Sequence, residues 1–255
     1  MTNRLSAADR SAARLDVTLA NSGRARSRSH ASELIRSGRV RLSGQPVTRP
    51  STKVLPDAPI DVDDDPWVSR GAHKLIGALD ESGITVPSVV LDAGACTGGF
   101  TQVLLDRGAQ RVHAVDVGHD QLAPQLRTDP RVSNHEGLNL RELSVGDLGG
   151  QLVDLIVGDV SFISLTLLLG PLSTVLSPDG VALLLVKPQF EVGRRRLGAG
   201  GVVRDPADRR RAVDTVVDAA AHIGLRSFWQ APSRVPGPSG NIEYFVGLRR
   251  GAIPD

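Results

Sequence analysis

The sequence has few of the features that are typical of membrane proteins, secreted proteins or metalloproteins. Cys96 is its one cysteine in 255 residues, which excludes an internal disulfide and a thiolate-rich metal site. No apolar run approaches the roughly 20 residues needed to cross a bilayer, and residues 1–6 lack the apolar core of a signal peptide. These absences predict a cytoplasmic protein with no membrane partner and no bound metal.

Lysine is scarce as well. Of the 30 basic residues only three are lysines, namely Lys53, Lys74 and Lys187. Arginine keeps its proton at any accessible pH, whereas lysine can lose its proton when it is desolvated or near other cations. Lys74 and Lys187 lie in the most motif-like stretches of this arginine-rich chain. We therefore interpret them as residues kept for chemistry; compositional drift is the alternative.

The net charge of +2 hides an uneven distribution along the chain. Residues 1–55 carry eleven basic and three acidic side chains, an excess of eight positive charges, so the other 200 residues carry a net charge of −6. A basic segment joined to an acidic body is typical of a polyanion-binding module attached to a second domain. The length suits one such small module beside a domain of ordinary size.

The basic segment is predicted to form two short helices and a hairpin. Apolar residues indicate helices over residues 14–21 and 29–37, each followed by a glycine that suits a helix C-cap. A strand, a Ser-Gly turn and a second strand follow over residues 40–47. Guanidinium groups bind phosphate through charge-assisted bonds. Our candidates for contacts with RNA are Arg14, Arg24, Arg26, Arg28, Arg36, Arg39 and Arg41.

This order of elements resembles a known RNA-binding domain. Residues 26–40, Arg-Ser-Arg-Ser-His-Ala-Ser-Glu-Leu-Ile-Arg-Ser-Gly-Arg-Val, carry most of the resemblance to the small domain first known from ribosomal protein S4. The segment holds no Phe, Trp or Tyr, so base stacking is not expected there. We therefore expect recognition of the RNA backbone and its shape.

The rest of the chain alternates apolar runs with helix-like segments. Four near-continuous apolar runs are typical of parallel strands buried on both faces. They lie at residues 89–91, 111–115, 152–157 and 181–186. A long helix is expected over 205–223, and the runs at 227–230 and 242–248, joined by a loop without a helix, should pair antiparallel at the sheet edge. The pattern predicts an α/β fold, a Rossmann-like class I methyltransferase with a mostly parallel sheet and an antiparallel last strand.

A cofactor site is predicted where the first of these strands meets the next helix, in Leu91-Asp-Ala-Gly-Ala-Cys-Thr-Gly-Gly-Phe100. Open α/β sheets bind ligands at the carboxyl ends of their strands, and Asp116, after the second strand, suits hydrogen bonds from ribose hydroxyls. Cys96 replaces the middle glycine of a dinucleotide motif, and the Asp92 carboxylate would repel a pyrophosphate. That acid suits the cationic end of S-adenosylmethionine; NAD is the alternative.

The candidate cofactor-binding residues follow from this arrangement. They are Asp92, Gly94, Cys96, Thr97, Gly98, Gly99, Phe100, Asp116, Val117, Asn139 and Asp159. Cys96 is interpreted as a small residue of the wall rather than as a nucleophile. Asn139, in the loop after the expected third strand, has an ordinary surface-loop position as its alternative.

Two lysines and two carboxylates are expected to meet beside this site. Asp159 follows the apolar run at 152–157 and Lys187 the run at 181–186, the fourth and fifth strands if a third precedes Asn139. Glu243 lies near the start of the last strand, and Lys74 lies on the helix before the first. Such a charge-balanced cluster suits removal of a proton from a weakly acidic hydroxyl, with a carboxylate orienting the lysine that accepts it. Two ordinary salt bridges at strand ends are the alternative.

Six motifs together resemble the TlyA family. They are Ser69-Arg-Gly-Ala-His-Lys-Leu75, Asp92-Ala-Gly-Ala-Cys-Thr-Gly-Gly-Phe100, Asp159-Val-Ser-Phe-Ile-Ser164, Lys187-Pro-Gln-Phe-Glu-Val-Gly193, Gly200-Gly-Val-Val203 and Gly237-Pro-Ser-Gly-Asn-Ile-Glu-Tyr-Phe245. The resemblance, over about residues 14–249, implies an S-adenosylmethionine-dependent ribosomal RNA 2'-O-ribose methyltransferase with an FtsJ-like catalytic domain behind an S4-type domain. It also implies that Lys74, Asp159, Lys187 and Glu243 match the family's catalytic tetrad, with Lys187 as the base.

Two features depart from the family pattern. The joint between the domains usually reads Arg-x-Trp-Val, and here Asp65 stands in place of the arginine. The chain also ends at Asp255, soon after the last strand, whereas longer members continue further. The first departure bears on communication between the domains and the second on the choice of RNA target.

The predicted reaction is transfer of a methyl group from S-adenosylmethionine to the ribose 2'-hydroxyl of a nucleotide, by resemblance a cytidine, in ribosomal RNA. Residues 1–62 would form the RNA-binding domain, 63–70 a linker and 71–255 the methyltransferase domain. The expected partners are ribosomal RNA or assembled ribosomal subunits; the oligomeric state is left open, with a monomer favoured. The alternatives are a non-catalytic RNA-binding or ribosome-assembly factor and a haemolysin, a name attached to this family, which the lack of a membrane-inserting segment disfavours.

Overall fold

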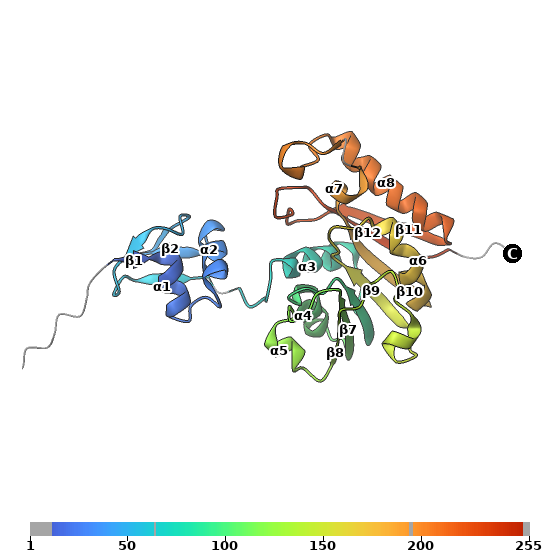
Figure 1. Ribbon diagram of the computed structural model, residues 1–255, viewed down its shortest axis with the longest axis horizontal. Helices are drawn as coiled ribbons and strands as arrows, with labels where there is room; N and C mark the ends of the chain where they lie inside the picture. The colour runs from blue at the N-terminus through green and yellow to red at the C-terminus, as the bar shows by residue number, and fades with distance from the viewer. Residues whose placement is uncertain (1–11, 64, 194–195, 252–255) are drawn as a thin grey trace, which may run out of the picture. The chain divides into compact units, whose positions relative to one another are not determined.

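The chain divides into two compact units, Met1–Pro66 and Trp67–Asp255. The computed structural model describes residues 12–63, 65–193 and 196–251 (Figure 1). The predicted boundaries at residues 62 and 71 lie on either side of this division.

The first unit is a small α+β domain. Its helices are α1 (Leu15–Asn21) and α2 (Arg28–Arg36), and α2 begins at a cap in which the Ser27 side chain accepts a hydrogen bond from the backbone N–H of His30. Three strands form a sheet in the order β3-β2-β5, and two more pair separately. These strands are β1 (Ala13–Arg14), β2 (Val40–Leu42), β3 (Gln45–Pro46), β4 (Lys53–Val54) and β5 (Ile60–Val62).

The hydrophobic core of this unit lies between the helices and the strands. Leu15 and Leu19 of α1 pack with Leu34 and Ile35 of α2 and with Val40 of β2. The β2–β3 hairpin turns through two residues with positive φ, as a tight two-residue hairpin requires. The two helices and the hairpin predicted from the sequence are therefore confirmed.

The second unit is built on a seven-stranded sheet in the order β11-β12-β10-β9-β6-β7-β8. The five strands from β10 to β8 in this order are parallel, β12 pairs antiparallel with β10, and β11 pairs antiparallel with β12. The strands are β6 (Val89–Ala93), β7 (Arg111–Asp116), β8 (Val132–Glu136), β9 (Val153–Gly158), β10 (Leu176–Val186), β11 (Leu225–Pro232) and β12 (Tyr244–Arg250). This arrangement confirms the predicted mostly parallel Rossmann-like sheet with an antiparallel last strand.

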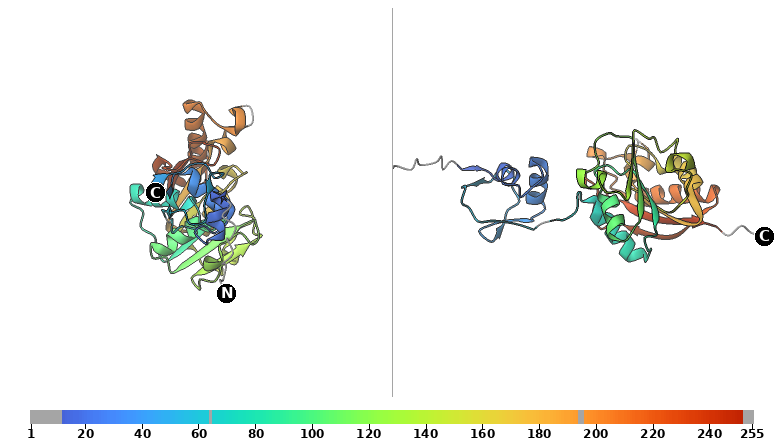
Figure 2. Two further views of the ribbon diagram at one scale, coloured as in Figure 1. Left: turned by 90° about the vertical axis from the view of Figure 1, so that its left-hand side faces the viewer. Right: turned by 90° about the horizontal axis from the view of Figure 1, so that it is seen from below.

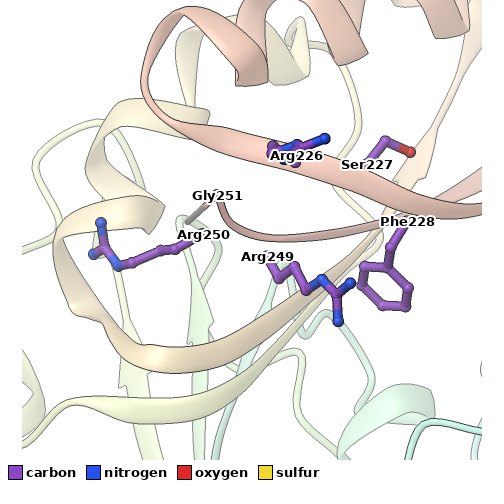
Figure 3. A pocket seen from close by; sticks show the side chains of 6 residues that line it. All are labelled: Arg226, Ser227, Phe228, Arg249, Arg250 and Gly251. Carbon is purple, nitrogen blue, oxygen red and sulfur yellow. The ribbon is translucent and has the colours of Figure 1, made fainter. Parts of the chain in front are cut away.

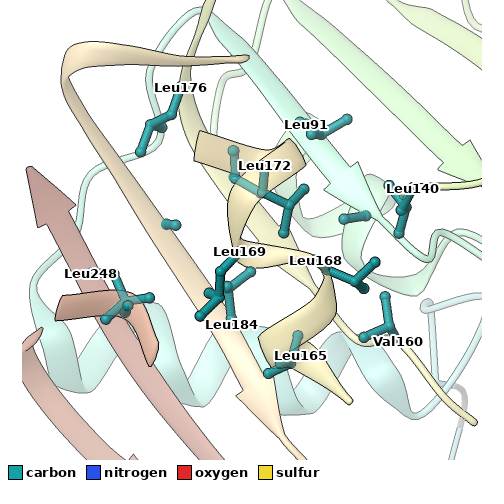
Figure 4. Packing of buried hydrophobic residues seen from close by; sticks show 14 of the residues in the cluster. Leu91, Leu140, Val160, Leu165, Leu168, Leu169, Leu172, Leu176, Leu184 and Leu248 are labelled. Carbon is teal, nitrogen blue, oxygen red and sulfur yellow. The ribbon is translucent and has the colours of Figure 1, made fainter. Parts of the chain in front are cut away.

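Helices cover both faces of this sheet (Figure 1; Figure 2). Core residues of α3 (Gly71–Ser82), α4 (Gly99–Asp106) and α5 (Pro124–Arg127) pack on one face. Those of η2 (Leu165–Leu167), α6 (Leu169–Val175) and α8 (Pro206–His222) pack on the other, where leucines of the η2–α6 segment meet the strands (Figure 4). The remaining short helices are η1 (Val145–Leu148), α7 (Pro188–Glu191) and η4 (Ala199–Gly201).

Burial on both faces explains the near-continuous apolar runs of the sequence. Successive strand residues point to opposite faces, so Val90 belongs to the core beside α3 and α4, and Leu91 to the core beside α6 and α8. If helices covered only one face of the sheet, one of these two apolar side chains would be exposed to water. In the part of the chain that the structure describes, no helix is both long and apolar enough to cross a membrane.

Candidate active site

Four ionisable side chains form a continuous chain of ion pairs in the second unit. The Lys74 Nζ lies 2.7 Å from Glu243 Oε2 and 3.4 Å from Asp159 Oδ2. The Lys187 Nζ lies 2.7 Å from Asp159 Oδ1. Asp159 thus bridges the two lysines, and the order along the chain of contacts is Glu243, Lys74, Asp159, Lys187.

The sheet brings three of these residues to one edge. Val186 pairs with Tyr244, so Lys187 and Glu243, the next residue on each strand toward that edge, stand beside each other. On the opposite side of β10 from β12, Leu184 pairs with Gly158, the last residue of β9, and Asp159 comes directly after Gly158. This is the carboxyl edge of the parallel strands, where open α/β sheets bind ligands.

Lys74 reaches the same place from α3, and the cluster is largely withdrawn from water. The exposed fractions of the side chains are 1% for Glu243, 7% for Lys74, 8% for Lys187 and 20% for Asp159. Buried charges are tolerated when they are paired and hydrogen-bonded, and two cations here balance two carboxylates. Asp159 is the most accessible of the four, so the cluster is open to solvent chiefly at Asp159.

Ser161, Ser164 and Glu191 make further contacts on the loop after Asp159, and sequence reasoning did not single them out. Lys187 Nζ donates a hydrogen bond of 2.6 Å to Ser161 Oγ, so this lysine is held by a hydroxyl as well as by Asp159. The Glu191 carboxylate accepts hydrogen bonds from Ser164 Oγ and from the backbone N–H of Leu165, which ties down the end of the same loop. Ser161, Ser164 and Glu191 lie within the sequence motifs, but their spacing alone does not distinguish them from their neighbours.

A close approach of backbone fixes the position of Glu243. A side chain at Gly237 would place its Cβ 2.5 Å from Glu243 Oε1, well inside contact distance, so only glycine fits there. The same segment is anchored by Asn241, whose buried amide accepts from the N–H of Val203 and donates to the carbonyl of Gly201. The two glycine-rich motifs, Gly200-Gly-Val-Val203 and Gly237–Phe245, therefore support Glu243 together.

The predicted cofactor loop runs from the end of β6 to the start of α4. Gly94, Cys96 and Gly98 all have positive φ, and the exposed Cys96 is the one non-glycine residue among them. The Asp116 carboxylate, at the end of β7, accepts hydrogen bonds from the N–H groups of Cys96 (2.8 Å) and Gly118 (2.7 Å). These bonds leave lone pairs on both oxygens, because a carboxylate offers about four acceptor sites.

Asp92 occupies a different position from the one expected. It lies within β6 rather than in the loop, it is buried, and one of its oxygens accepts a hydrogen bond of 2.7 Å from Thr101. Its Oδ1 is buried with no hydrogen-bond partner among the described residues. Burial raises the pKa of Asp92 to about 7, and the nearby carboxylates of Asp159 and Asp116 add to the shift.

Asp116 and Asp159 make the carboxyl ends of β7 and β9 acidic, and Asp92 adds negative charge at the end of β6 only as it loses its proton near pH 7. A pyrophosphate would be repelled there, whereas the sulfonium and ammonium groups of S-adenosylmethionine would be attracted. The unpartnered Oδ1 of Asp92 is a further oxygen to which the ammonium group of such a ligand can donate a hydrogen bond. The residues present therefore fit S-adenosylmethionine.

The other candidate cofactor residues divide into two groups. Val117 is exposed beside Asp116 and offers an apolar surface for a nucleobase, and Thr97 is half-buried in the loop. Phe100 is instead buried and stacks on Phe245 in the core. Asn139 is exposed, and its Oδ1 accepts a hydrogen bond from a backbone N–H two residues along.

Gly94, Gly98 and Gly99 are required by packing within the protein. A Cβ at Gly98 would lie 2.3 Å from a methyl carbon of Leu126, and one at Gly99 would lie 2.2 Å from Ser69 Oγ. A Cβ at Gly94 would approach Val160 to 3.0 Å. These glycines let the loop pack against its neighbours, so any contribution to a ligand is through their backbone.

Replacing Asp92 by asparagine should change how stability depends on pH. With its pKa raised to about 7, folded Asp92 keeps a proton over a range, from about pH 4 to 7, in which the unfolded chain has lost it. The contribution of this group to stability is therefore largest near pH 4 and falls as the pH rises to 7, by at most about 4 kcal/mol. Asparagine cannot titrate, so Asp92→Asn should become more stable relative to the parent chain as the pH rises.

Urea unfolding of both proteins at about pH 5 and about pH 8 measures this difference. The pH dependence of the parent chain alone would also include His113, because burial lowers the pKa of this residue to about 4. Both proteins contain His113, so its effect cancels in the difference between them. That group has the opposite effect, since the unfolded chain binds its proton first and stability falls as the pH drops below about 6.5. A stability difference between the two proteins that is the same at both pH values would contradict the prediction for Asp92.

The arginines predicted to contact RNA lie in the first unit, and several already have partners there. Arg14 and Arg28 lie 2.9 and 3.0 Å from the buried carboxylate of Asp16 and hold its pKa well below the usual range. Arg24 donates a hydrogen bond of 2.8 Å to the carbonyl of Ile60. A guanidinium has five N–H donors, so an arginine with one such partner can still bind a phosphate.

The other four candidates lie around α2 and the hairpin. Arg36 and Arg41 are exposed, and Arg26 contacts a histidine ring of α2. Arg39 lies 2.6 Å from Asp65, the residue that departs from the family pattern. The acidic residue at the joint is thus paired with a candidate RNA-binding arginine of its own unit.

The fold and the ion-pair cluster define the class of this protein as a Rossmann-like methyltransferase preceded by an RNA-binding domain. Residues 67–250 match the FtsJ-like methyltransferase family, and residues 13–60 match the S4 domain. The chain belongs to the TlyA family of FtsJ-like methyltransferases, as its similarity to individual members shows.

Two relatives and one solved structure define this similarity. The 16S/23S rRNA (cytidine-2'-O)-methyltransferase TlyA of Mycobacterium tuberculosis is 51% identical over 241 residues, which cover 93% of this chain and 90% of that protein. The 23S rRNA (cytidine-2'-O)-methyltransferase TlyA of Campylobacter jejuni is 38% identical over 181 residues, 70% of this chain and 69% of that protein. The structure of a candidate hemolysin from Streptococcus thermophilus superposes with a TM-score of 0.76 at 35% identity, covering 96% of this chain and 90% of that one.

Proposed function

We propose that this protein transfers the methyl group of S-adenosylmethionine to the ribose 2'-hydroxyl of a cytidine in ribosomal RNA. The observation that carries the proposal is the continuous ion-pair chain from Glu243 through Lys74 and Asp159 to Lys187 at the carboxyl edge of the sheet. The names of the relatives from M. tuberculosis and C. jejuni support the choice of ribosomal RNA and of cytidine. A non-catalytic assembly factor would have no need for two lysines and two carboxylates in one buried cluster.

The chemistry assigned to the cluster is proton removal. S-adenosylmethionine, when bound, supplies a methyl group on a sulfonium sulfur. Lys187, in its free-amine form, would accept the proton of the 2'-hydroxyl as the ribose oxygen bonds to the methyl carbon and the methyl–sulfur bond breaks, which would leave a neutral thioether. Asp159 and Ser161 hold the Lys187 amine in place, at 2.7 and 2.6 Å.

The sheet edge and the acidic loop would hold the cofactor. Asp116 would accept hydrogen bonds from the ribose of the cofactor, Val117 would contact its adenine, and Asp92 and Asp159 would face its cationic end. Gly94, Cys96, Thr97, Gly98 and Gly99 would contribute backbone. The buried ring of Phe100 would support the loop from below, and Asn139 is the outermost candidate.

The first unit would recognise the RNA. Residues 1–62 act as the RNA-binding domain and 63–70 as the linker, and residues 71–255 carry the reaction. Arg36, exposed at the end of α2, and Arg41, exposed in the hairpin, supply accessible positive charge. The protein works in the cytoplasm on ribosomal RNA or assembled ribosomal subunits.

Mapping 2'-O-methyl groups on ribosomal RNA tests the proposal directly. RNA from cells with and without this protein should differ at one or a few cytidines, and the purified protein with S-adenosylmethionine should restore those modifications on unmodified subunits. Identical maps, together with no methyl transfer to either subunit in vitro, would refute the proposed reaction. If methyl transfer is absent, calorimetric titration with S-adenosylmethionine then shows whether the protein still binds the cofactor without catalysing the reaction.

An exposed aromatic residue beside the cluster is placed to hold the target base. Phe162 follows Ser161, is 91% exposed, and has φ of +65°, which is unusual for a bulky residue. Its ring lies 5.5 Å from that of Phe190, between centroids. Such strain and exposure need a compensating role, and an aromatic platform next to Lys187 and Asp159 suits a nucleotide taken out of its stack.

Phe162→Ala should weaken use of the RNA without unfolding the protein. Loss of stacking, worth about 1–3 kcal/mol per base, should raise KM for RNA roughly 5- to 150-fold, because the base would lose its platform. Phe162→Tyr keeps a ring and serves as the matched control, with KM close to that of the parent. Equal KM values for the alanine and tyrosine variants would contradict the role given to this ring.

A further inference from the structure

A second cationic site lies at the end of β12 that is remote from Glu243. Residues of β11 and β12 surround a cavity of about 510 Å³ there (Figure 3). The residues that line it are Arg226, Ser227, Phe228, Arg249, Arg250 and Gly251. Arg249 is six residues along the strand from Glu243, which places it about 20 Å from the ion-pair cluster.

Two arginines of this site face each other across the strands. Arg226 and Arg249 are directly opposed in the antiparallel β11–β12 pair, and like charges in that position destabilise a sheet. Neither guanidinium has a carboxylate within 4.0 Å among the described residues. Residues 56–255 have a net charge of −6, yet no described acidic side chain pairs with either arginine. The positive charge of the two guanidinium groups can therefore bind an anionic ligand.

Phe228 completes the site through a local irregularity of β11. The register shifts between Ser227 and Trp229, so Phe228 is the extra residue of a bulge, a feature that often redirects a side chain. Its ring is 38% exposed and covers Gly247, where a Cβ would lie 2.9 Å from the ring. The Arg249 guanidinium carbon lies 5.3 Å from the ring centroid, so the aromatic ring holds this arginine in place (Figure 3).

The neighbouring Arg250 points to the other side of the strand. It donates hydrogen bonds to the carbonyls of Ser173 and Leu176 at the end of α6. It therefore serves the packing of that helix, and the ligand-facing charges are those of Arg226 and Arg249. We name Arg226, Phe228 and Arg249 the β11–β12 arginine cluster.

We propose that the β11–β12 arginine cluster binds the backbone of a second segment of the ribosomal RNA substrate, away from the target nucleotide. Guanidinium groups bind phosphates bidentately, and an aromatic ring with a stacked arginine is typical of surfaces that bind nucleic acid. Phosphates at this site would also relieve the repulsion between Arg226 and Arg249. The inference rests on the proposed function for the identity of the RNA, and it adds a second RNA-binding surface, at the β11–β12 end of the catalytic sheet, to the one proposed for the first unit.

The test is the double substitution Arg226→Gln with Arg249→Gln in the full chain. Affinity for deproteinised ribosomal RNA should fall roughly 10- to 100-fold. The slope of log affinity against log salt should shrink by about 1.8 for two lost phosphate contacts. The turnover number at saturating RNA should be unchanged, because the reacting groups are untouched, and the thermal midpoint should be equal or higher because like charges have been removed.

The matched control is Arg111→Gln with Arg131→Gln. These arginines lie at the start of β7 and just before β8, on the opposite side of the same sheet, and Arg131 is paired with Asp129. The control removes the same charge from the same domain, so it should leave affinity and salt slope within about twofold of the parent. A third variant, Phe228→Leu, keeps the apolar cover over Gly247 and should weaken RNA binding only a few-fold.

Three results would overturn the inference. The first is an affinity and a salt slope that the Arg226 and Arg249 substitutions leave unchanged, and the second is a change in either no larger than that in the control. A loss of affinity for assembled subunits but not for deproteinised RNA would identify a ribosomal protein as the partner instead. RNA binding is measured without methyl transfer, so a parent chain that binds RNA through this cluster but never methylates it would refute the proposed function and leave this inference standing.

Discussion

Lys187→Arg is expected to abolish methyl transfer while leaving binding of S-adenosylmethionine nearly unchanged. Arginine preserves the positive charge opposite Asp159 and much of the length of the side chain, but it cannot exist as a free base at accessible pH. If Lys187 is the proton acceptor, the turnover number should fall by about 10² to 10⁴, the usual contribution of a general base. Single-turnover transfer to ribosomal RNA and calorimetric titration with the cofactor measure the two effects separately.

The control for this experiment is the same substitution at another lysine. Lys53 lies in β4 of the first unit, outside the ion-pair cluster, and Lys53→Arg should keep full activity. Methylation by Lys187→Arg at a rate within a few-fold of the parent would remove Lys187 from the role of base. An equal loss of cofactor affinity would instead show that the substitution had disturbed the site as a whole.

Lys74→Met is expected to destabilise the protein strongly as well as inactivate it. Glu243 is 1% exposed and has Lys74 as its ion-pair partner, at 2.7 Å. Removing that partner leaves a buried carboxylate uncompensated, which typically costs about 3–5 kcal/mol. The free energy of unfolding from urea titration should fall by that amount near neutral pH.

A second substitution distinguishes stability from catalysis. Lys74→Met combined with Glu243→Leu removes both charges, so most of the lost stability should return while methyl transfer stays absent. The exposed pair of Arg107 and Asp80, 2.8 Å apart, provides the comparison. Arg107→Gln should cost less than about 1 kcal/mol. Recovery of activity in the double variant, or equal costs for Lys74→Met and Arg107→Gln, would contradict the part assigned to the buried pair.

The strands could be predicted because parallel strands buried on both faces need apolar residues at nearly every position. The runs at 89–91, 111–115 and 181–186 fall within β6, β7 and β10, and the run at 152–157 begins one residue before β9. The antiparallel end of the sheet followed from a loop without a helix between residues 230 and 242. The extent of β10 did not follow, since its first half, Leu176–Gly180, includes Pro178 and Asp179, which disfavour a strand.

The convergence of Lys74, Asp159, Lys187 and Glu243 could be inferred from topology, because strand ends meet at one edge. Their order of contact could not, since it depends on side-chain reach across α3, β9, β10 and β12. The positions of Asp92 and Phe100 show the same limit. Both lie in the cofactor motif, yet one is buried in β6 and the other packs on Phe245, because a motif does not state which side of the chain faces the ligand.

The sequence by itself determined the class of fold, the family and the set of ionisable residues from which a site can be built. Periodicity and motif spacing are local properties, so they can be recognised in the sequence without the tertiary structure. Only the tertiary structure decided that Asp159 bridges both lysines, that Ser161 holds Lys187, and that Arg226 opposes Arg249 beside Phe228. Those contacts join residues from separate elements, and their distances depend on the register and packing of the whole sheet.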